Sequence, residues 1–292
     1  MKSFLFLLLF SFLLSSAGFG QSVIKETLPI QSTILGKEVQ YSIYLPDGYD
    51  RTNRIYPVLY LLHGYGDDET GWTQFGEVEH IADKAIADGT ATPMIIAMPD
   101  GGVTWYLNTF DGKVKYEDFF IKEFIPHIDK TYRTRASKQY RAIAGLSMGG
   151  YGSLLQATKH PDMFSSCSAL SSGVFTDDEI ASASDNVWSM LSSLYGKKEL
   201  TGKNRLTPHY QENSIISIVN NGNAEALSKV RYYLDCGDKD FLIKGNMALH
   251  AAMIDKKIPH EFRVREGVHS WSYWRSALPE VLKFASVSFH QQ

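Results

Sequence analysis

The chain has 292 residues, of which 44% are hydrophobic, 21% charged and 13% aromatic, and this ordinary globular composition excludes a disordered, collagen-like or disulfide-stapled protein. A formal net charge of −3, without any run of like charges, offers nothing to attract nucleic acid, so we expect no nucleic-acid partner. Cys167 and Cys236 are too few for a disulfide framework or a thiolate metal site; buried free thiols are the default expectation, and a disulfide between them stays open.

The N-terminus has the three parts of an export signal. Lys2 supplies a basic start, residues 4–14 are almost purely apolar, and small residues follow up to Gly20. The apolar part is shorter than the roughly 20 residues that a membrane-spanning helix needs. We therefore predict a signal peptide over residues 1–20 and an exported mature chain, periplasmic or secreted. Residues 21–292 are expected to form a single domain that has no membrane contact after cleavage.

Short apolar, β-prone runs alternate with helical patterns along the rest of the chain. Residues 56–62 and 94–98 are continuous apolar runs, as expected of strands buried on both faces. The expected strands are residues 38–45, 56–62, 94–98, 141–146, 164–171, 230–236 and 260–265. The expected helices are residues 116–132, with a kink at Pro126, 151–160, 241–256 and 271–289. This alternation predicts an α/β fold with a doubly wound, mostly parallel sheet and helices on both faces.

One polar stretch interrupts the alternation. Residues 173–223 are rich in Ser, Asn, Asp and Lys and have weak periodicity. Because this segment is too long for an ordinary connection, it is predicted to be an insertion with short helices of its own. We expect it to lie over the substrate pocket.

The segment GLSMG, residues 145–149, matches the pattern G-x-S-x-G between a β-prone run and a helical run. In that setting the serine occupies a tight, strained turn, and its hydroxyl projects above the carboxyl end of the sheet. A serine hydroxyl is a poor nucleophile unless a base takes its proton and a third group orients that base. Ser147 is therefore predicted to be a nucleophile whose acid and histidine partners follow in that order.

The partners of Ser147 are expected in the loops after the last two strands. His269 lies in GVHSW, between the final strand and the final helix, where chain order requires the base. The preceding loop, GDKDF, offers two carboxylates; Asp240, just before a helix, is predicted to be the acid, and Asp238 is the alternative. The backbone N–H groups of Met148 and of Tyr65, in the glycine-rich loop HGYG, are predicted to form the oxyanion hole.

Other residues near these loops are expected to have structural or substrate-binding roles. His63 ends an early strand and is expected to make structural hydrogen bonds. Residues 67–69 are acidic, but no further ligands are spaced around them and no H-E-x-x-H motif occurs, so neither a metal nor another cofactor is expected. Trp105, Tyr106 and Trp271 are candidate substrate-binding residues, with core filling as the competing interpretation.

Six segments resemble the esterase D and feruloyl esterase-like branch of the α/β-hydrolase superfamily, which is similar to carbohydrate esterase family 1. They run in family order over residues 39–282 and read LLHGYGDDETGW, MPDGG followed by WYLN, YEDFFIKEFIPHIDKTYRT, RAIAGLSMGGYGSLLQATKHPDMFSS, CGDKDFL and GVHSWSYWRSALPEVL. The resemblance implies an α/β-hydrolase fold with Ser147 as nucleophile and His269 as base. It also favours Asp240 over Asp238 as the acid.

The resemblance implies a serine esterase that acts on a small-molecule or oligosaccharide ester, and the predicted signal peptide makes it an exported one. Feruloyl or acetyl esters of a plant-type polysaccharide such as xylan are the expected substrates. A siderophore esterase or a general short-chain carboxylesterase is the alternative, and a carbohydrate-binding protein without chemistry is the alternative from another class. The acyl group, the alcohol and the oligomeric state stay open at this point.

Overall fold

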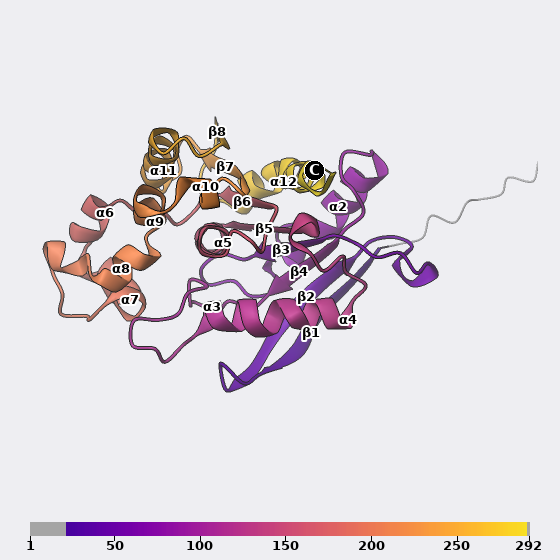
Figure 1. Ribbon diagram of the computed structural model, residues 1–292, viewed down its shortest axis with the longest axis horizontal. Helices are drawn as coiled ribbons and strands as arrows, with labels where there is room; N and C mark the ends of the chain where they lie inside the picture. The colour runs from indigo at the N-terminus through magenta and orange to yellow at the C-terminus, as the bar shows by residue number, and fades with distance from the viewer. Residues whose placement is uncertain (1–21, 291–292) are drawn as a thin grey trace, which may run out of the picture.

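The computed structural model describes residues 22–290, so the predicted signal peptide lies outside the described residues (Figure 1). These residues form an eight-stranded sheet with the order β1-β2-β4-β3-β5-β6-β7-β8. The strands are β1 (Val23–Ser32), β2 (Lys37–Leu45), β3 (Val58–Leu62), β4 (Ile95–Pro99), β5 (Arg141–Leu146), β6 (Ser166–Leu170), β7 (Arg231–Gly237) and β8 (His260–Arg265). The β1–β2 and β2–β4 pairs are antiparallel and the other pairs are parallel, which confirms the predicted mostly parallel sheet.

The two faces of the sheet carry separate cores, because successive side chains of a strand point to opposite faces. In β3, Leu59 and Leu61 pack into one core, and Tyr60 and Leu62 pack into the other. The first core is covered by α2 (Val78–Ala87) and α12 (Trp271–His290), which lie side by side in Figure 1. The second core is covered by α3 (Tyr116–Phe119), α4 (Ile125–Thr131), α5 (Met148–Lys159) and α11 (Ile243–Asp255).

The segment from Tyr116 to Thr131 shows how proline shapes a helix. A π-helical turn, Phe120–Phe124, joins α3 to α4, and Pro126 stands in the first turn of α4. A first-turn residue needs no intrahelical partner for its N–H, so proline is tolerated there. Where the sequence predicts a kink, the helical pitch changes just before Pro126.

The polar insertion contains several short helices, as predicted. They are α6 (Asp177–Ala181), α7 (Asp185–Tyr195), α8 (Pro208–Asn213) and α9 (Ile215–Asn221), with a 3₁₀ turn at Gly202–Arg205; α10 (Ala224–Leu227) follows. Each α-helix begins at a side-chain cap, in order Thr176, Ser184, Thr207, Ser214 and Asn223. Such caps satisfy N–H groups that the first turn leaves free, which explains why so polar a segment is helical. In Figure 1, α6, α7 and α8 form the left end of the molecule.

The sequence did not predict the edge strand β1 or the two helices between β3 and β4. The edge strand β1 is mostly exposed, and its register shifts between Lys25 and Leu28, where Thr27 has a φ of 53°. The helices α1 (Gly71–Gln74) and α2 lie between β3 and β4. Among the described residues, no helix has both the length and the apolar character needed to cross a membrane.

Candidate active site

Ser147 lies on the turn between β5 and α5, with φ 52° and ψ −116°. A positive φ in a non-glycine residue costs of the order of 1–3 kcal/mol and persists only where the surroundings enforce it. Here the Ser147 N–H donates to the Leu170 carbonyl at 2.9 Å, and the Ser147 carbonyl accepts from the Gly173 N–H at 2.8 Å. The strained turn of the G-x-S-x-G pattern is therefore present, held by the chain that follows β6.

Close backbone packing explains the glycines on either side of Ser147. A Cβ added at Gly145 would lie 2.4 Å from the Gly149 carbonyl oxygen. A Cβ added at Gly149 would lie 2.4 Å from the carbonyl oxygen of Leu62 and 2.5 Å from that of His63. Both positions exclude a side chain because the turn lies against the end of β3.

Replacing Gly149 by alanine is expected to destabilise the fold strongly. Overpacking typically costs about 1–3 kcal/mol, and here it comes on top of a backbone clash. The matched control is Gly36→Ala, where the new Cβ meets open space but φ is +65°, so only a conformational cost of about 1–2 kcal/mol applies. Thermal unfolding monitored by circular dichroism should give the lower Tm to Gly149→Ala. Equal Tm values would contradict the packing argument.

The fold brings Ser147, His269 and Asp240 into one hydrogen-bonded line. His269 Nε2 lies 2.9 Å from Ser147 Oγ, and His269 Nδ1 lies 2.9 Å from Asp240 Oδ2 and 3.1 Å from its Oδ1. His269 is in the loop between β8 and α12, and Asp240 follows β7. The three residues thus come from the carboxyl ends of parallel strands, which meet at one edge of the sheet. This arrangement can remove a proton from the serine hydroxyl.

The two candidate acids occupy different places. Asp240 is buried and accepts from the Leu242 N–H at 2.9 Å, whereas Asp238 is exposed and accepts from the Gly267 N–H at 2.9 Å. Burial raises the pKa of Asp240, but hydrogen bonds from His269, Leu242 and Ser171 outweigh it and hold the pKa below the ordinary carboxyl value. Asp240 is therefore ionised beside the imidazole.

Ser171 is a polar contact of the acid that the sequence did not single out. It follows β6 with a φ of 43°, and its hydroxyl accepts from Trp274 Nε1 at 3.1 Å and hydrogen-bonds to Asp240. The Trp274 ring also lies 4.8 Å from the imidazole of His269 and perpendicular to it. Trp274 therefore contacts both the base and the serine that fixes the acid. The position of Ser171 just after a central strand was the available signal.

A second, fully buried carboxylate fastens the loop that carries His269. Asp235, in β7, accepts hydrogen bonds from Arg265 of β8 at 2.8 Å, from Tyr233 and from Tyr273 of α12. These contacts join the two elements on either side of His269. Asp235 thus explains why the loop has a defined place.

The predicted oxyanion donors lie next to the nucleophile. A Cβ at Gly64 would be 2.7 Å from the Leu146 side chain and 3.6 Å from Ser147 Cβ, so the Gly64–Tyr65 backbone passes beside Ser147. Met148 is the first residue of α5. Among the residues described, neither the Tyr65 N–H nor the Met148 N–H donates to a protein acceptor. Both donors are thus free for an oxygen bound near Ser147.

His63 is bonded at both ring nitrogens. Its Nδ1 lies 2.8 Å from the Gly64 carbonyl oxygen, which can only accept, and its Nε2 lies 2.7 Å from the Gly101 N–H, which can only donate. These partners require a neutral ring with the proton on Nδ1. The side chain therefore makes structural hydrogen bonds, as expected, and holds the loop that carries Tyr65.

Trp105 and Tyr106 both have positive φ values, 55° and 58°, and belong to one strained loop. Trp105 is 7% exposed, its Nε1 is buried without a partner in the described part of the chain, and its ring lies 2.6 Å from a Cβ placed on Gly173. Tyr106 is fully buried, and its hydroxyl donates to the His63 carbonyl at 3.0 Å. Tyr106 can therefore influence a ligand only through the loop that it holds.

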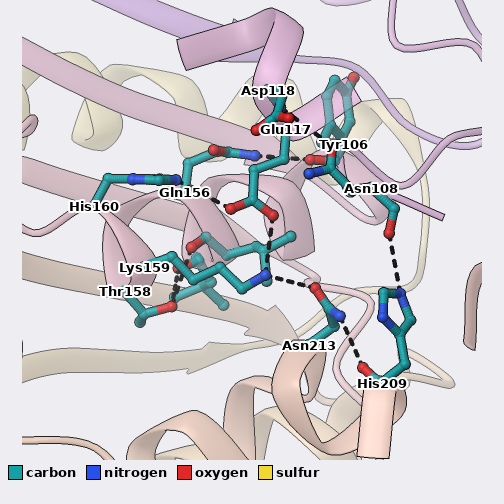
Figure 2. Close-up of polar contacts among 12 residues, drawn as sticks. Tyr106, Asn108, Glu117, Asp118, Gln156, Thr158, Lys159, His160, His209 and Asn213 are labelled. Carbon is teal, nitrogen blue, oxygen red and sulfur yellow. Dashed lines mark hydrogen bonds and ion pairs between the residues drawn. The ribbon is translucent and has the colours of Figure 1, made fainter. Parts of the chain in front are cut away.

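A polar network, shown in Figure 2, ties this loop and the insertion to the helix that follows Ser147. Gln156 of α5 donates to the Tyr106 carbonyl at 2.7 Å, and His209 of α8 contacts the Asn108 carbonyl at 3.0 Å. Lys159 of α5 reaches both Glu117 of α3, at 2.9 Å, and Asn213 of α8, at 2.7 Å. The insertion is therefore anchored to α5 and to the Trp105 loop.

Trp271 and Asp67 of the acidic loop both lie against Gly71. The half-buried Trp271 ring contacts those of Trp72, Phe75 and Trp274, at centroid distances of 5.3 to 5.9 Å. In the acidic loop, Glu69 is buried and accepts a hydrogen bond from Thr27 Oγ1 at 3.0 Å. No group of three or more metal-ligating side chains occurs within residues 22–290.

Both cysteines are buried free thiols. Burial raises the pKa of Cys236 to about 12 and raises that of Cys167 further, which leaves almost no reactive thiolate at neutral pH. We expect two thiols per chain to react with an aromatic disulfide reagent after unfolding, and neither to react rapidly in the native protein. If the unfolded protein has no reactive thiols in the absence of a reductant, the two cysteines instead form a disulfide.

Comparisons with known proteins agree with this geometry. The model of the Esterase family matches residues 32–285. The chain is 41% identical over 152 residues to an endo-1,4-beta-xylanase/feruloyl esterase of Xylanibacter ruminicola, a match that covers 50% of this chain and 21% of that protein. It is 24% identical to an acetyl esterase of Caldicellulosiruptor saccharolyticus over 228 residues, 78% of this chain and 82% of that one. The chain spans only 21% to 30% of the length of the first three curated relatives.

Solved structures confirm the predicted α/β-hydrolase fold. A ferulic acid esterase superimposes with a TM-score of 0.80 at 34% identity, over 93% of this chain and 99% of that one. The fluorophosphonate-binding serine hydrolase FphF of Staphylococcus aureus gives a TM-score of 0.75 at 23% identity, over 91% and 99%. At that lower identity the likeness concerns the fold alone.

Proposed function

The chain belongs to the Esterase family, and from this premise we propose that it is a serine esterase that hydrolyses carboxylic esters through Ser147, His269 and Asp240. The observation that carries the proposal is the continuous line of hydrogen bonds from Ser147 Oγ through the His269 imidazole to Asp240. A nucleophile, a base within hydrogen-bond distance and a group that orients the base are the three parts that acyl transfer needs.

The first half of the reaction forms an acyl-enzyme. Ser147 Oγ attacks the ester carbonyl carbon while His269 Nε2, at 2.9 Å, takes the hydroxyl proton. Asp240 accepts the Nδ1–H hydrogen bond and thereby keeps Nε2 free to accept. The carbonyl oxygen gains negative charge and is stabilised by the N–H groups of Tyr65 and Met148. His269 then gives its proton to the alcohol oxygen, and the alcohol leaves.

The second half uses water in place of the alcohol. His269 takes a proton from the water as its oxygen attacks the acyl carbon on Ser147, and the same two N–H groups hold the new oxyanion. Collapse of this intermediate releases the carboxylic acid and returns the proton to Ser147. The chemistry needs no cofactor.

We propose feruloyl or acetyl esters of a xylan-type polysaccharide as the substrates. The support is similarity to an endo-1,4-beta-xylanase/feruloyl esterase, to an acetyl esterase and to a ferulic acid esterase structure. Trp105, beside the nucleophile turn, and Trp271 are proposed to contact the substrate. We further propose that residues 1–20 direct export, because a polysaccharide lies outside the cell.

Hydrolysis of an ester panel by the purified mature protein tests the proposal. The panel holds methyl ferulate, a feruloylated arabinoxylan oligomer, acetylated xylan, and p-nitrophenyl acetate and butyrate. Ser147-dependent release of ferulate or acetate from the xylan substrates is expected. Turnover of only the small activated esters would favour a siderophore or general short-chain esterase, and no turnover at all would favour a carbohydrate-binding protein.

A further inference from the structure

Phe241, the residue directly after the proposed acid, is unusually exposed for a large apolar side chain. Its exposed fraction is 72%, the highest among the large hydrophobic residues described. Its ring centroid nevertheless lies 4.6 Å from the centroid of the His269 imidazole, with 49° between the planes. An aromatic ring open to solvent therefore lies directly against the proposed base.

Most of the surroundings of His269 are occupied by protein. Nδ1 faces Asp240, Nε2 faces Ser147, and the buried Trp274 ring lies 4.8 Å from the imidazole. Of the two large aromatic rings that contact the imidazole in the described part of the chain, Phe241 is the one that solvent reaches. Val268, on the same loop as His269, is also half exposed, at 50%.

The order of the reaction decides which part of an ester meets this ring. The alcohol oxygen must come within about 3 Å of His269 Nε2 to receive its proton. The oxyanion points in a different direction, toward the N–H groups of Tyr65 and Met148, and the acyl substituent takes the remaining direction from the tetrahedral carbon. The alcohol half therefore lies on the His269 side, next to Phe241.

We infer that Phe241 is the specificity-determining platform for the alcohol half of the substrate, which in the proposed polysaccharide esters is a sugar. The inference rests on the proposed esterase function. An exposed aromatic ring offers a flat apolar surface on which the C–H face of a pyranose or furanose can pack while the sugar hydroxyls stay in water. A methyl or ethyl alcohol is too small to use that surface.

Esters of one acid with different alcohols isolate this contact. They pass through the same acyl-enzyme, so a difference between their kcat/KM values arises in acylation, where the alcohol is still bound. The test measures kcat/KM for methyl ferulate and for ferulate esterified to arabinose, and for methyl acetate and an acetylated xylo-oligosaccharide. The quantity compared is the ratio of the sugar ester to the methyl ester of the same acid. This ratio cancels any general effect of a substitution on His269.

The variants are Phe241→Ala, Phe241→Tyr, which keeps the ring, and Phe110→Ala as a matched control. Phe110 is 41% exposed, and its ring contacts His209 instead of His269. Phe241→Ala is expected to lower the ratio about fivefold to tenfold for both acids, the size of one aromatic contact. Phe241→Tyr should restore it, and Phe110→Ala should leave it unchanged.

Results against the role of Phe241 can be distinguished from a result against the proposed function. Turnover with an unchanged ratio in Phe241→Ala would overturn the inference alone. If Phe241→Ala lowers kcat/KM for both ferulate esters but for neither acetate ester, Phe241 contacts the acyl group. That result would also overturn the inference. A wild-type protein that hydrolyses none of the four esters would overturn the proposed function, and the inference with it.

Discussion

Replacement of Ser147 by alanine is expected to lower kcat about 10⁶-fold, because the residues of such a triad act as a unit and loss of the nucleophile removes the whole covalent route. The residual rate should come from binding and from the Tyr65 and Met148 N–H groups alone. Initial rates on p-nitrophenyl acetate, measured at high enzyme concentration, check this.

The fold should survive this substitution. The side chain of Ser147 contacts His269, whereas the strained turn is held through backbone groups, which alanine retains. The Tm of Ser147→Ala should therefore stay within a few degrees of that of the wild type. Retained turnover in a folded Ser147→Ala protein would contradict the assignment of the nucleophile.

Replacement of Asp240 by asparagine is expected to lower kcat about 10⁴-fold. Asparagine presents an N–H₂ group or a neutral oxygen to His269 Nδ1, so it neither fixes the required tautomer nor stabilises the imidazolium. The matched control is Asp238→Asn in the same loop, where the amide oxygen can still accept from the Gly267 N–H. Rates of Asp238→Asn should stay within a few-fold of the wild type; equal losses in the two variants would remove the distinction between the acids.

The lowered pKa of Asp240 predicts how the free energy of unfolding depends on pH. The pKa of Asp240 in the folded protein lies below its ordinary value, so the ionised group stabilises the fold at pH values above the unfolded pKa of about 3.9. That contribution is lost as the pH falls through the lower, folded pKa. Urea unfolding should show a smaller difference in the free energy of unfolding between wild type and Asp240→Asn below about pH 4 than at pH 5. A difference that grows in acid would contradict the direction of the pKa shift.

The sequence predicts the central fold well because central strands must be apolar on both sides. Of the predicted strands 56–62 and 94–98, residues 58–62 form β3 and residues 95–98 lie in β4, and their unbroken apolar runs reflect the two cores. β1 carries no such signal, since it is an exposed edge strand whose bulge at Thr27 breaks the alternation. The short helices of the insertion follow from individual caps, which indicate where helices begin but not how they pack.

Some residues of the candidate site could be predicted from the sequence, and others were not. Ser147, Asp240 and His269 could be proposed from chain order, because each follows a strand whose carboxyl end must lie at the same edge of the sheet. Ser171 and Phe241 were not singled out, since their importance depends on contacts with Asp240 and His269 that only the folded chain creates. Tyr106 is the opposite case. Its sequence position made it a candidate substrate-binding residue, but the folded chain buries its side chain completely.

The most direct test of the central claim is covalent labelling of the wild-type protein with a fluorophosphonate ester, read by intact mass and peptide mapping. In the expected reaction Ser147 Oγ forms a bond to phosphorus, the P–F bond breaks, fluoride leaves, and the hydroxyl proton passes to His269. We expect one adduct per chain, on the peptide that contains Ser147, and none on Ser147→Ala. An unlabelled wild-type protein, or an adduct on another residue, would contradict the central claim.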